Sequence, residues 1–288
     1  MCHRDWMKES MSYKIVVDSC TDLPKEYHND PRFEIVPLVL QVGDLNILDD
    51  ETFDQLDYIK KVAECETCAK SACPSPDRYK KAYDTDADDV YVVTLSSKLS
   101  GSYNSALIGK DIYHEDIGPK NIHVFDSLSA CCGQTNVAFK IMEYAEAGLP
   151  FEEVIKKVEE YRDGMDTYFV LDSLDTLRKN GRLTGMKAIV ASTLNIKPVC
   201  YAVEGTIAQW GQGIGMRKAL IKMAELAAER IKNPEEKTLM ITHINCYERA
   251  EVVKDLILSK VNFKDSLIVD GAGVATTYAG DGGIVVTC

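Results

Sequence analysis

The first half of the chain alternates short apolar, β-branched runs with longer segments of helical periodicity. The apolar runs predict strands over residues 13–17, 34–42, 90–95 and 122–125. The segments between them predict helices over residues 52–63, 76–83, 102–113 and 130–147. Ser75-Pro76-Asp77 marks one of these helix starts, with Ser75 as the N-cap. Strands that alternate with helices indicate a parallel sheet.

The pattern changes after a predicted helix over residues 151–162 and Gly164. Strands are predicted over residues 167–171, 197–203, 206–210, 238–244, 266–269 and 284–287. Helices are predicted over residues 174–178, 186–194, 217–231 and 247–261. Glu204-Gly205 is typical of a hairpin turn, so this half contains antiparallel pairing. We therefore predict an α/β protein with an N-terminal parallel-sheet domain over residues 12–163 and a mixed α+β domain over residues 164–288.

Polar turns follow three of the predicted strands in the first half. They cover residues 18–21, 94–102 and 126–127. Because ligands of parallel sheets bind outside the carboxyl ends of the strands, we expect these turns to converge on one site.

Two hydroxyl-rich stretches give that site its chemistry. The first puts Ser96, Ser97, Ser100 and Ser102 between a strand and a helix, and the second is Ser71-Ala-Cys-Pro-Ser-Pro76. Unpaired N–H groups and the positive end of a helix favour an anion, so the pattern indicates a carboxylate or a phosphate. Gly280-Asp-Gly-Gly283 lacks the Gly-Lys-Ser/Thr of a P-loop and is more typical of close backbone packing.

The net charge of -12 argues against nucleic acid or an anionic membrane surface as the main partner. No apolar run is long enough to span a membrane. Residues 1–11 are polar, lack the apolar region of a signal peptide, and are predicted to form a disordered extension. We expect a cytoplasmic protein.

The ten cysteines need their own interpretation. Cys65, Cys68 and Cys73 have a faintly metal-like spacing, but no fourth ligand lies near them in the sequence. Without a secretory signal, disulfides are not expected either. We predict reduced thiols, including the adjacent Cys131 and Cys132, many of them buried as small hydrophobic residues, and no metal site.

Several ordered motifs carry a resemblance to a known family. They are Val17-Asp-Ser-Cys-Thr-Asp-Leu-Pro24, Ser71-Ala-Cys-Pro-Ser-Pro76, Leu95-Ser-Ser-Lys-Leu-Ser-Gly-Ser-Tyr-Asn-Ser-Ala106, Asp126-Ser127, Leu174-Asp-Thr-Leu-Arg-Lys-Asn-Gly-Arg-Leu183, Lys197-Pro198 and Gly280-Asp-Gly-Gly283. Over residues 14–288 the chain resembles the DegV family, bacterial fatty-acid-binding proteins that serve as acyl-carrier subunits of fatty acid kinase. The resemblance implies a non-catalytic protein without a cofactor, which binds a long-chain fatty acid in an apolar tunnel between two domains.

The same resemblance implies which residues hold the fatty-acid carboxylate. Ser71 stands where the family usually has a threonine, and Ser97 belongs to the intact Ser-Ser-x-Leu-Ser-Gly motif, with Ser96 and Ser100 as alternatives. Tyr278 stands where the family often has a histidine. A tyrosine hydroxyl can donate a hydrogen bond, but it lacks the charge tuning of a histidine.

An ATP-dependent fatty acid kinase is the implied partner. The surface of this chain that docks the kinase would include the basic residues Arg178, Lys179 and Arg182. The same residues equally suit a solvated helix end or a salt bridge that closes the mouth of the tunnel. Arg217 follows Gln212-Gly-Ile-Gly-Met, where the family commonly has a more basic stretch.

Two other functions remain open at this point. Ser97 could be the nucleophile of an acyl hydrolase, which requires a base beside it, and no Gly-x-Ser-x-Gly motif occurs. Alternatively, the protein could carry another apolar, anionic ligand without a kinase partner.

Overall fold

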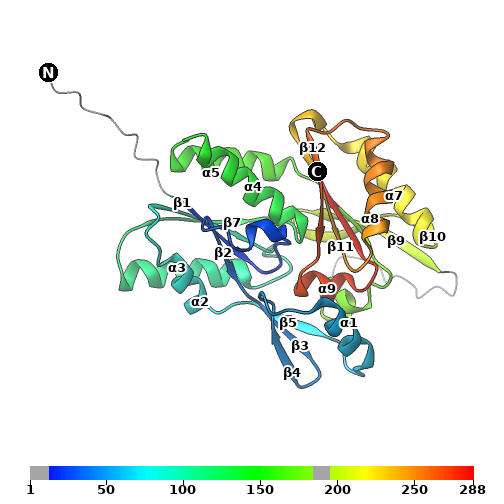
Figure 1. The fold of residues 1–288 in the computed structure, drawn as a ribbon, viewed down its shortest axis with the longest axis horizontal. Helices are drawn as coiled ribbons and strands as arrows, with labels where there is room; N and C mark the ends of the chain where they lie inside the picture. Colours follow the sequence, from blue (N-terminus) through cyan, green and yellow to red (C-terminus); the bar gives the residue numbers. More distant parts are fainter. Residues whose placement is uncertain (1–12, 184–194) are drawn as a thin grey trace.

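The computed structural model describes residues 13–183 and 195–288, and its architecture is the predicted α/β one (Figure 1). Four parallel strands in the order β2-β1-β6-β7 form the first sheet: β1 (Tyr13–Asp18), β2 (Phe33–Val36), β6 (Asp89–Thr94) and β7 (Asn121–Asp126). The polar turns that follow β1, β6 and β7 therefore lie at one sheet edge, as predicted.

Helices cover both faces of this sheet because its strands are apolar on both sides. Val16, Val90 and Val92 pack against α2 (Pro76–Tyr83) and α3 (Ser102–Asp116). Their neighbours Ile15 and Val93 pack on the other face, against α4 (Cys132–Glu146) and α5 (Phe151–Asp163). The sheet is thus the centre of a three-layer arrangement.

A second sheet of six strands has the order β10-β9-β8-β13-β11-β12. Its strands are β8 (Thr167–Val170), β9 (Ile196–Val203), β10 (Thr206–Ile214), β11 (Thr238–His243), β12 (Asp265–Asp270) and β13 (Ile284–Thr287). All neighbours pair antiparallel except β11 and β12. The helices α7 (Met216–Arg230) and α8 (Tyr247–Leu258) pack on its outer face, and α6 (Asp175–Lys179) follows β8.

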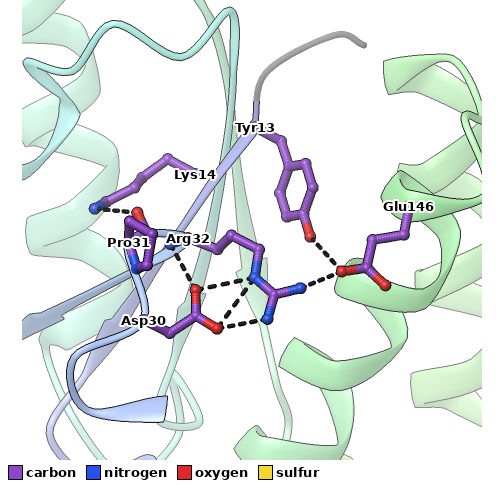
Figure 2. Close-up of polar contacts among 6 residues, drawn as sticks. All are labelled: Tyr13, Lys14, Asp30, Pro31, Arg32 and Glu146. Atoms are coloured by element: carbon purple, nitrogen blue, oxygen red, sulfur yellow. Dashed lines mark hydrogen bonds and ion pairs between the residues drawn. The ribbon is translucent and has the colours of Figure 1, made fainter.

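The helix α4 joins the two sheets, since it packs against β1 and β6 on one side and against β11 and β13 on the other. At its N-terminal end, the backbone N–H of Cys132 donates to the hydroxyl of Thr242, 3.1 Å away. Figure 2 shows its C-terminal end, where Glu146 accepts hydrogen bonds from Arg32 and from the hydroxyl of Tyr13. Arg32 also bonds Asp30 and lowers the pKa of that carboxyl.

A small antiparallel sheet of order β4-β3-β5 lies apart from the other two. It contains β3 (Val39–Val42), β4 (Leu45–Leu48) and β5 (Lys70–Ala72) and packs with α1 (Gln55–Glu64) and α9 (Gly273–Ala279) (Figure 1). The single strand predicted over residues 34–42 is therefore wrong. Pro37 cannot donate to a strand ladder, and the chain leaves the first sheet there to enter the small one.

Other boundaries shift for local reasons. Asp54 caps α1 by accepting from the N–H of Asp57, 2.9 Å away, so this helix begins later than residue 52. The elements β4, β5 and α9 were not predicted, nor were the 3-10 turns η1 (Lys25–Tyr27) and η2 (Pro234–Glu236). The helix predicted over residues 186–194 lies outside the described residues. Within residues 13–183 and 195–288, no helix has the length and apolar character needed to cross a bilayer.

Candidate functional site

An apolar cavity of about 330 Å³ lies between the turns of the first sheet and the inner face of the second. Leu95 and Leu128 line it from the first half, and Phe169, Ile207 and Val285 line it from strands of the second sheet. The side chains of β8, β9, β10 and β13 that face away from α7 and α8 form this wall. Such a cavity suits a ligand with an extended hydrocarbon part.

Hydroxyl groups and one cation gather at one part of the wall. The hydroxyl of Ser71, on β5, lies 3.1 Å from that of Tyr278, on α9. The guanidinium of Arg182 lies over the ring of Tyr278, 5.6 Å from its centroid, and also lines the cavity. Arg182 is held there because its Nε donates to the carbonyl oxygen of Leu99 and its Nη1 to that of Asn180. Donors and a positive charge together suit a carboxylate.

The serines of the turn after β6 separate into two groups. Ser100 lines the cavity, and its hydroxyl accepts from the N–H of Ser102. Ser96 is fully buried, and its hydroxyl donates to the carbonyl oxygen of Gly205, 2.8 Å away. Ser97 lies outside the cavity wall, and its N–H donates to Asp126. Ser71, Ser100 and Tyr278 thus share the cavity, and a carboxylate contact by any of them remains a prediction.

The turn keeps this shape because Asp18, at the end of β1, holds both of its ends. One oxygen accepts from the N–H of Leu95 at 2.8 Å and from the hydroxyl of Ser102 at 2.6 Å. The other accepts from the side-chain amide of Gln134 and from the N–H of Cys20. Complete burial raises the pKa of Asp18, even though these four donors lower it. The buried carboxylate of Asp18, at the end of β1, therefore fixes the turn that places Ser100 in the cavity wall.

Two thiols in the wall were not predicted as site residues. Cys20 and Cys131 both line the cavity and hydrogen-bond to each other. Cys131 has a φ of 56°, an unusual conformation for a residue with a side chain, at the start of α4. Its hydrogen bond with Cys20, together with burial, raises the pKa of its thiol. Both side chains form small, apolar parts of the cavity wall. The only sequence signal for this position is that Cys20 and Cys131 closely follow Asp18 and Asp126, the residues at which two of the strands end.

The three cysteines with metal-like spacing, Cys65, Cys68 and Cys73, each contact a different group. Cys65 lies beside the hydroxyl of Thr67, Cys68 beside the carbonyl oxygen of Ala69, and Cys73 lines the cavity. Among the residues that the structure describes, no group of three His, Cys, Asp or Glu side chains could hold a metal ion.

The basic residues proposed for docking do not share one environment. Arg178 and Lys179 are exposed on α6, where Arg178 pairs with Asp175, and Arg217 is exposed at the start of α7. Arg182 instead faces the cavity, as described above. Whether Arg182 contacts a kinase or closes the tunnel mouth by a salt bridge stays a prediction.

Comparison with known proteins identifies relatives over nearly the full chain. A family model described as "Uncharacterised protein, DegV family" matches residues 12–287. A DegV domain-containing protein of Streptococcus gordonii is 34% identical over 279 residues, which cover 96% of this chain and 98% of that protein.

Solved structures match the fold closely. A DegV family protein of Ruminococcus gnavus, refined with vaccenic acid, is 49% identical, with a TM-score of 0.94 over 96% of this chain and 99% of that one. The fatty acid kinase (Fak) B3 protein of Streptococcus pneumoniae, loaded with linoleic acid, is 31% identical, with a TM-score of 0.87 over 96% and 99% of the two chains. A DegV family protein of Eubacterium eligens, loaded with heptadecanoic acid, is 27% identical with a TM-score of 0.87 over the same shares.

Proposed function

Because this chain belongs to the DegV family, we propose that it binds a long-chain fatty acid in its apolar cavity and presents the carboxyl group to a separate kinase. The family membership predicted from the sequence motifs is confirmed by the family model and by the relatives. The observation that carries the proposal is the pairing of an apolar wall with Ser71, Tyr278 and Arg182 at one part of it.

The two parts of the cavity would have different tasks. Each methylene group removed from water contributes about 0.8 kcal/mol, so a long chain supplies most of the affinity. A buried carboxylate without donors would be costly, and the hydroxyls with Arg182 reduce this cost. The wall would thus set affinity for the chain, and the polar part would set the orientation and the preference for an acid.

Native mass spectrometry of the purified protein tests the proposal directly. We expect a mass increment equal to one long-chain fatty acid, or uptake of hexadecanoic acid after delipidation. Octanoic acid, which has the same carboxyl group and half the chain, should bind far more weakly. A delipidated protein that takes up no long-chain fatty acid contradicts the proposal.

The hydroxyl pair gives a more specific prediction. Tyr278→Phe should weaken the binding of hexadecanoic acid about tenfold or more, because a hydrogen bond to a charged group contributes about 1.5–3 kcal/mol. Binding of hexadecan-1-ol should change much less, so the acid-over-alcohol preference falls. Fluorescent-probe displacement measures both affinities. Tyr247→Phe, at an exposed tyrosine on α8, is the matched control. An unchanged preference in Tyr278→Phe would remove this tyrosine from the carboxylate site.

Presentation to a kinase is the finer part of the proposal. The family resemblance and the similarity to the Fak B3 protein support it, and Arg178, Lys179 and Arg217 offer exposed positive charge for docking. Incubation of the loaded protein with ATP and a bacterial fatty acid kinase should yield an acyl phosphate. Kinase-dependent ATP consumption that is unaffected by this protein would refute the presentation.

A hydrolase would need a base beside Ser97. The described histidines are engaged elsewhere: His28 and His114 bond backbone carbonyl oxygens, His123 faces Glu159, and His243 pairs with Asp270. Ser97 also lies outside the cavity wall, and our proposal is fatty-acid binding without catalysis.

A further inference from the structure

The helix α9 comes from the second half of the chain, but carboxylates of the first half hold its first turn. Asp49 accepts from the N–H of Gly273 at 2.7 Å and from that of Val274 at 3.0 Å. Asp22 accepts from the N–H of Ala272 at 2.8 Å. Three successive backbone donors are thus satisfied by two side chains more than 220 residues away in the sequence.

Both carboxylates are themselves fixed. The Asp49 oxygen that accepts from Val274 also accepts from the hydroxyl of Ser19. The Asp22 oxygen that does not bond Ala272 accepts from the hydroxyl of Thr242. Both side chains are almost fully buried. Burial raises the pKa of Asp49 to about 6 and that of Asp22 to about 7, so holding them here has a free-energy cost.

The fit between Asp49 and α9 is too close for loose docking. A Cβ atom at Gly273 would lie 2.5 Å from the carboxylate oxygen of Asp49 and 2.4 Å from Leu40. The backbone of α9 therefore approaches the first half at a position where only glycine fits.

The same short helix carries cavity side chains along its whole length. Val274, Ala275, Tyr278 and Ala279 line the cavity, and the hydroxyl of Tyr278 meets Ser71. Because α9 contains only residues 273–279, a shift of its first turn moves Tyr278 with it. The distance between the Tyr278 and Ser71 hydroxyls thus depends on Asp49 and Asp22.

We propose that Asp49 and Asp22 are positioning residues for carboxylate recognition, which hold α9 so that the Tyr278 hydroxyl and Ser71 meet the ligand's acid group. The inference rests on the proposed binding of a fatty acid. It separates recognition of the acid group, which depends on these two side chains, from binding of the hydrocarbon chain, to which α9 contributes only part of the apolar wall.

The test compares hexadecanoic acid with hexadecan-1-ol in Asp49→Asn, whose amide nitrogen places a donor where α9 needs an acceptor. We expect the acid-over-alcohol preference to fall about tenfold or more, as in Tyr278→Phe, with a much smaller change in the affinity for the alcohol. Asp49→Asn combined with Tyr278→Phe should lower the preference no further than either change alone, because both act through one hydroxyl. Asp50→Asn is the matched control, since Asp50 is adjacent in sequence and its carboxylate accepts from the N–H and the hydroxyl of Thr52.

Each alternative result has a distinct meaning. Equal loss of affinity for acid and alcohol, no change in preference, or multiplying effects in the double variant overturns the positioning role. A wild-type protein that binds neither ligand, or binds both equally, instead overturns the proposed function. If Asp49→Asn does not fold, Asp22→Asn should also lower the acid-over-alcohol preference, but by a smaller factor. Asp22 accepts from one backbone N–H at the start of α9, that of the N-cap residue Ala272, whereas Asp49 accepts from two.

Discussion

Val285→Trp should abolish the binding of a long-chain fatty acid while the protein stays folded. Val285 lies on β13 and faces the cavity, whereas the adjacent Val286 faces the outer core. A tryptophan at residue 285 would occupy space that several methylene groups of the ligand need. Displacing four of them loses about 3 kcal/mol, so the affinity should fall by more than about 100-fold. Probe displacement measures the affinity, and circular dichroism confirms the fold.

Val252→Trp is the control, because Val252 is exposed on α8 and lies outside the cavity wall. It adds the same aromatic surface and should leave the affinity unchanged. Binding of hexadecanoic acid by Val285→Trp to within about tenfold of the wild type would mean that the ligand occupies another site.

The first sheet was predictable because its signals are local. Val16, Ile15 and their neighbours form apolar, β-branched runs, and the runs of β1, β6 and β7 end in polar turns. Parallel strands then bring the turns together whatever the rest of the chain does. The sequence could not identify Asp18 as the residue that holds the turn after β6, because its donors Ser102 and Gln134 are distant along the chain.

The small sheet and α9 escaped prediction for a physical reason. Six of the seven residues of α9 are buried, so it has no polar face and no helical period. β5 has three residues, too few to show alternation. Both elements are stabilised by packing against segments far away in sequence. Ser71 and Tyr278, which sit on these elements, were therefore assigned through the family resemblance and not through periodicity.

Arg182 shows the same limit at the level of one side chain. In the sequence it forms a basic cluster with Arg178 and Lys179, and such clusters usually face solvent. The structure turns it inward because the carbonyl oxygens of Leu99 and Asn180 accept its N–H groups. Local charge patterning does not contain that information.

Asp18→Ala should destabilise the protein by roughly 3–5 kcal/mol, a large part of the 5–15 kcal/mol typical of a folded domain. The change leaves four donors without their acceptor at a fully buried position, among them the N–H of Leu95 and the hydroxyl of Ser102. Urea unfolding measures the effect. Asp116→Ala removes an exposed carboxylate paired with Lys80 and should cost less than about 1 kcal/mol. Similar losses in both variants would show that Asp18 does not hold the turn.

The pH dependence of Asp18→Asn then separates the charge of Asp18 from its hydrogen bonds. The raised pKa of Asp18 means that the folded state binds its proton more tightly than the unfolded chain does. Its contribution to the free energy of unfolding is therefore largest at low pH and is lost as the pH rises through the raised pKa, by at most about 1.4 kcal/mol per pH unit. Asparagine does not titrate, so the difference between wild type and Asp18→Asn should shrink as the pH rises. A difference that grows with pH would mean that the charged form of Asp18 stabilises the fold, and that its four donors outweigh its burial.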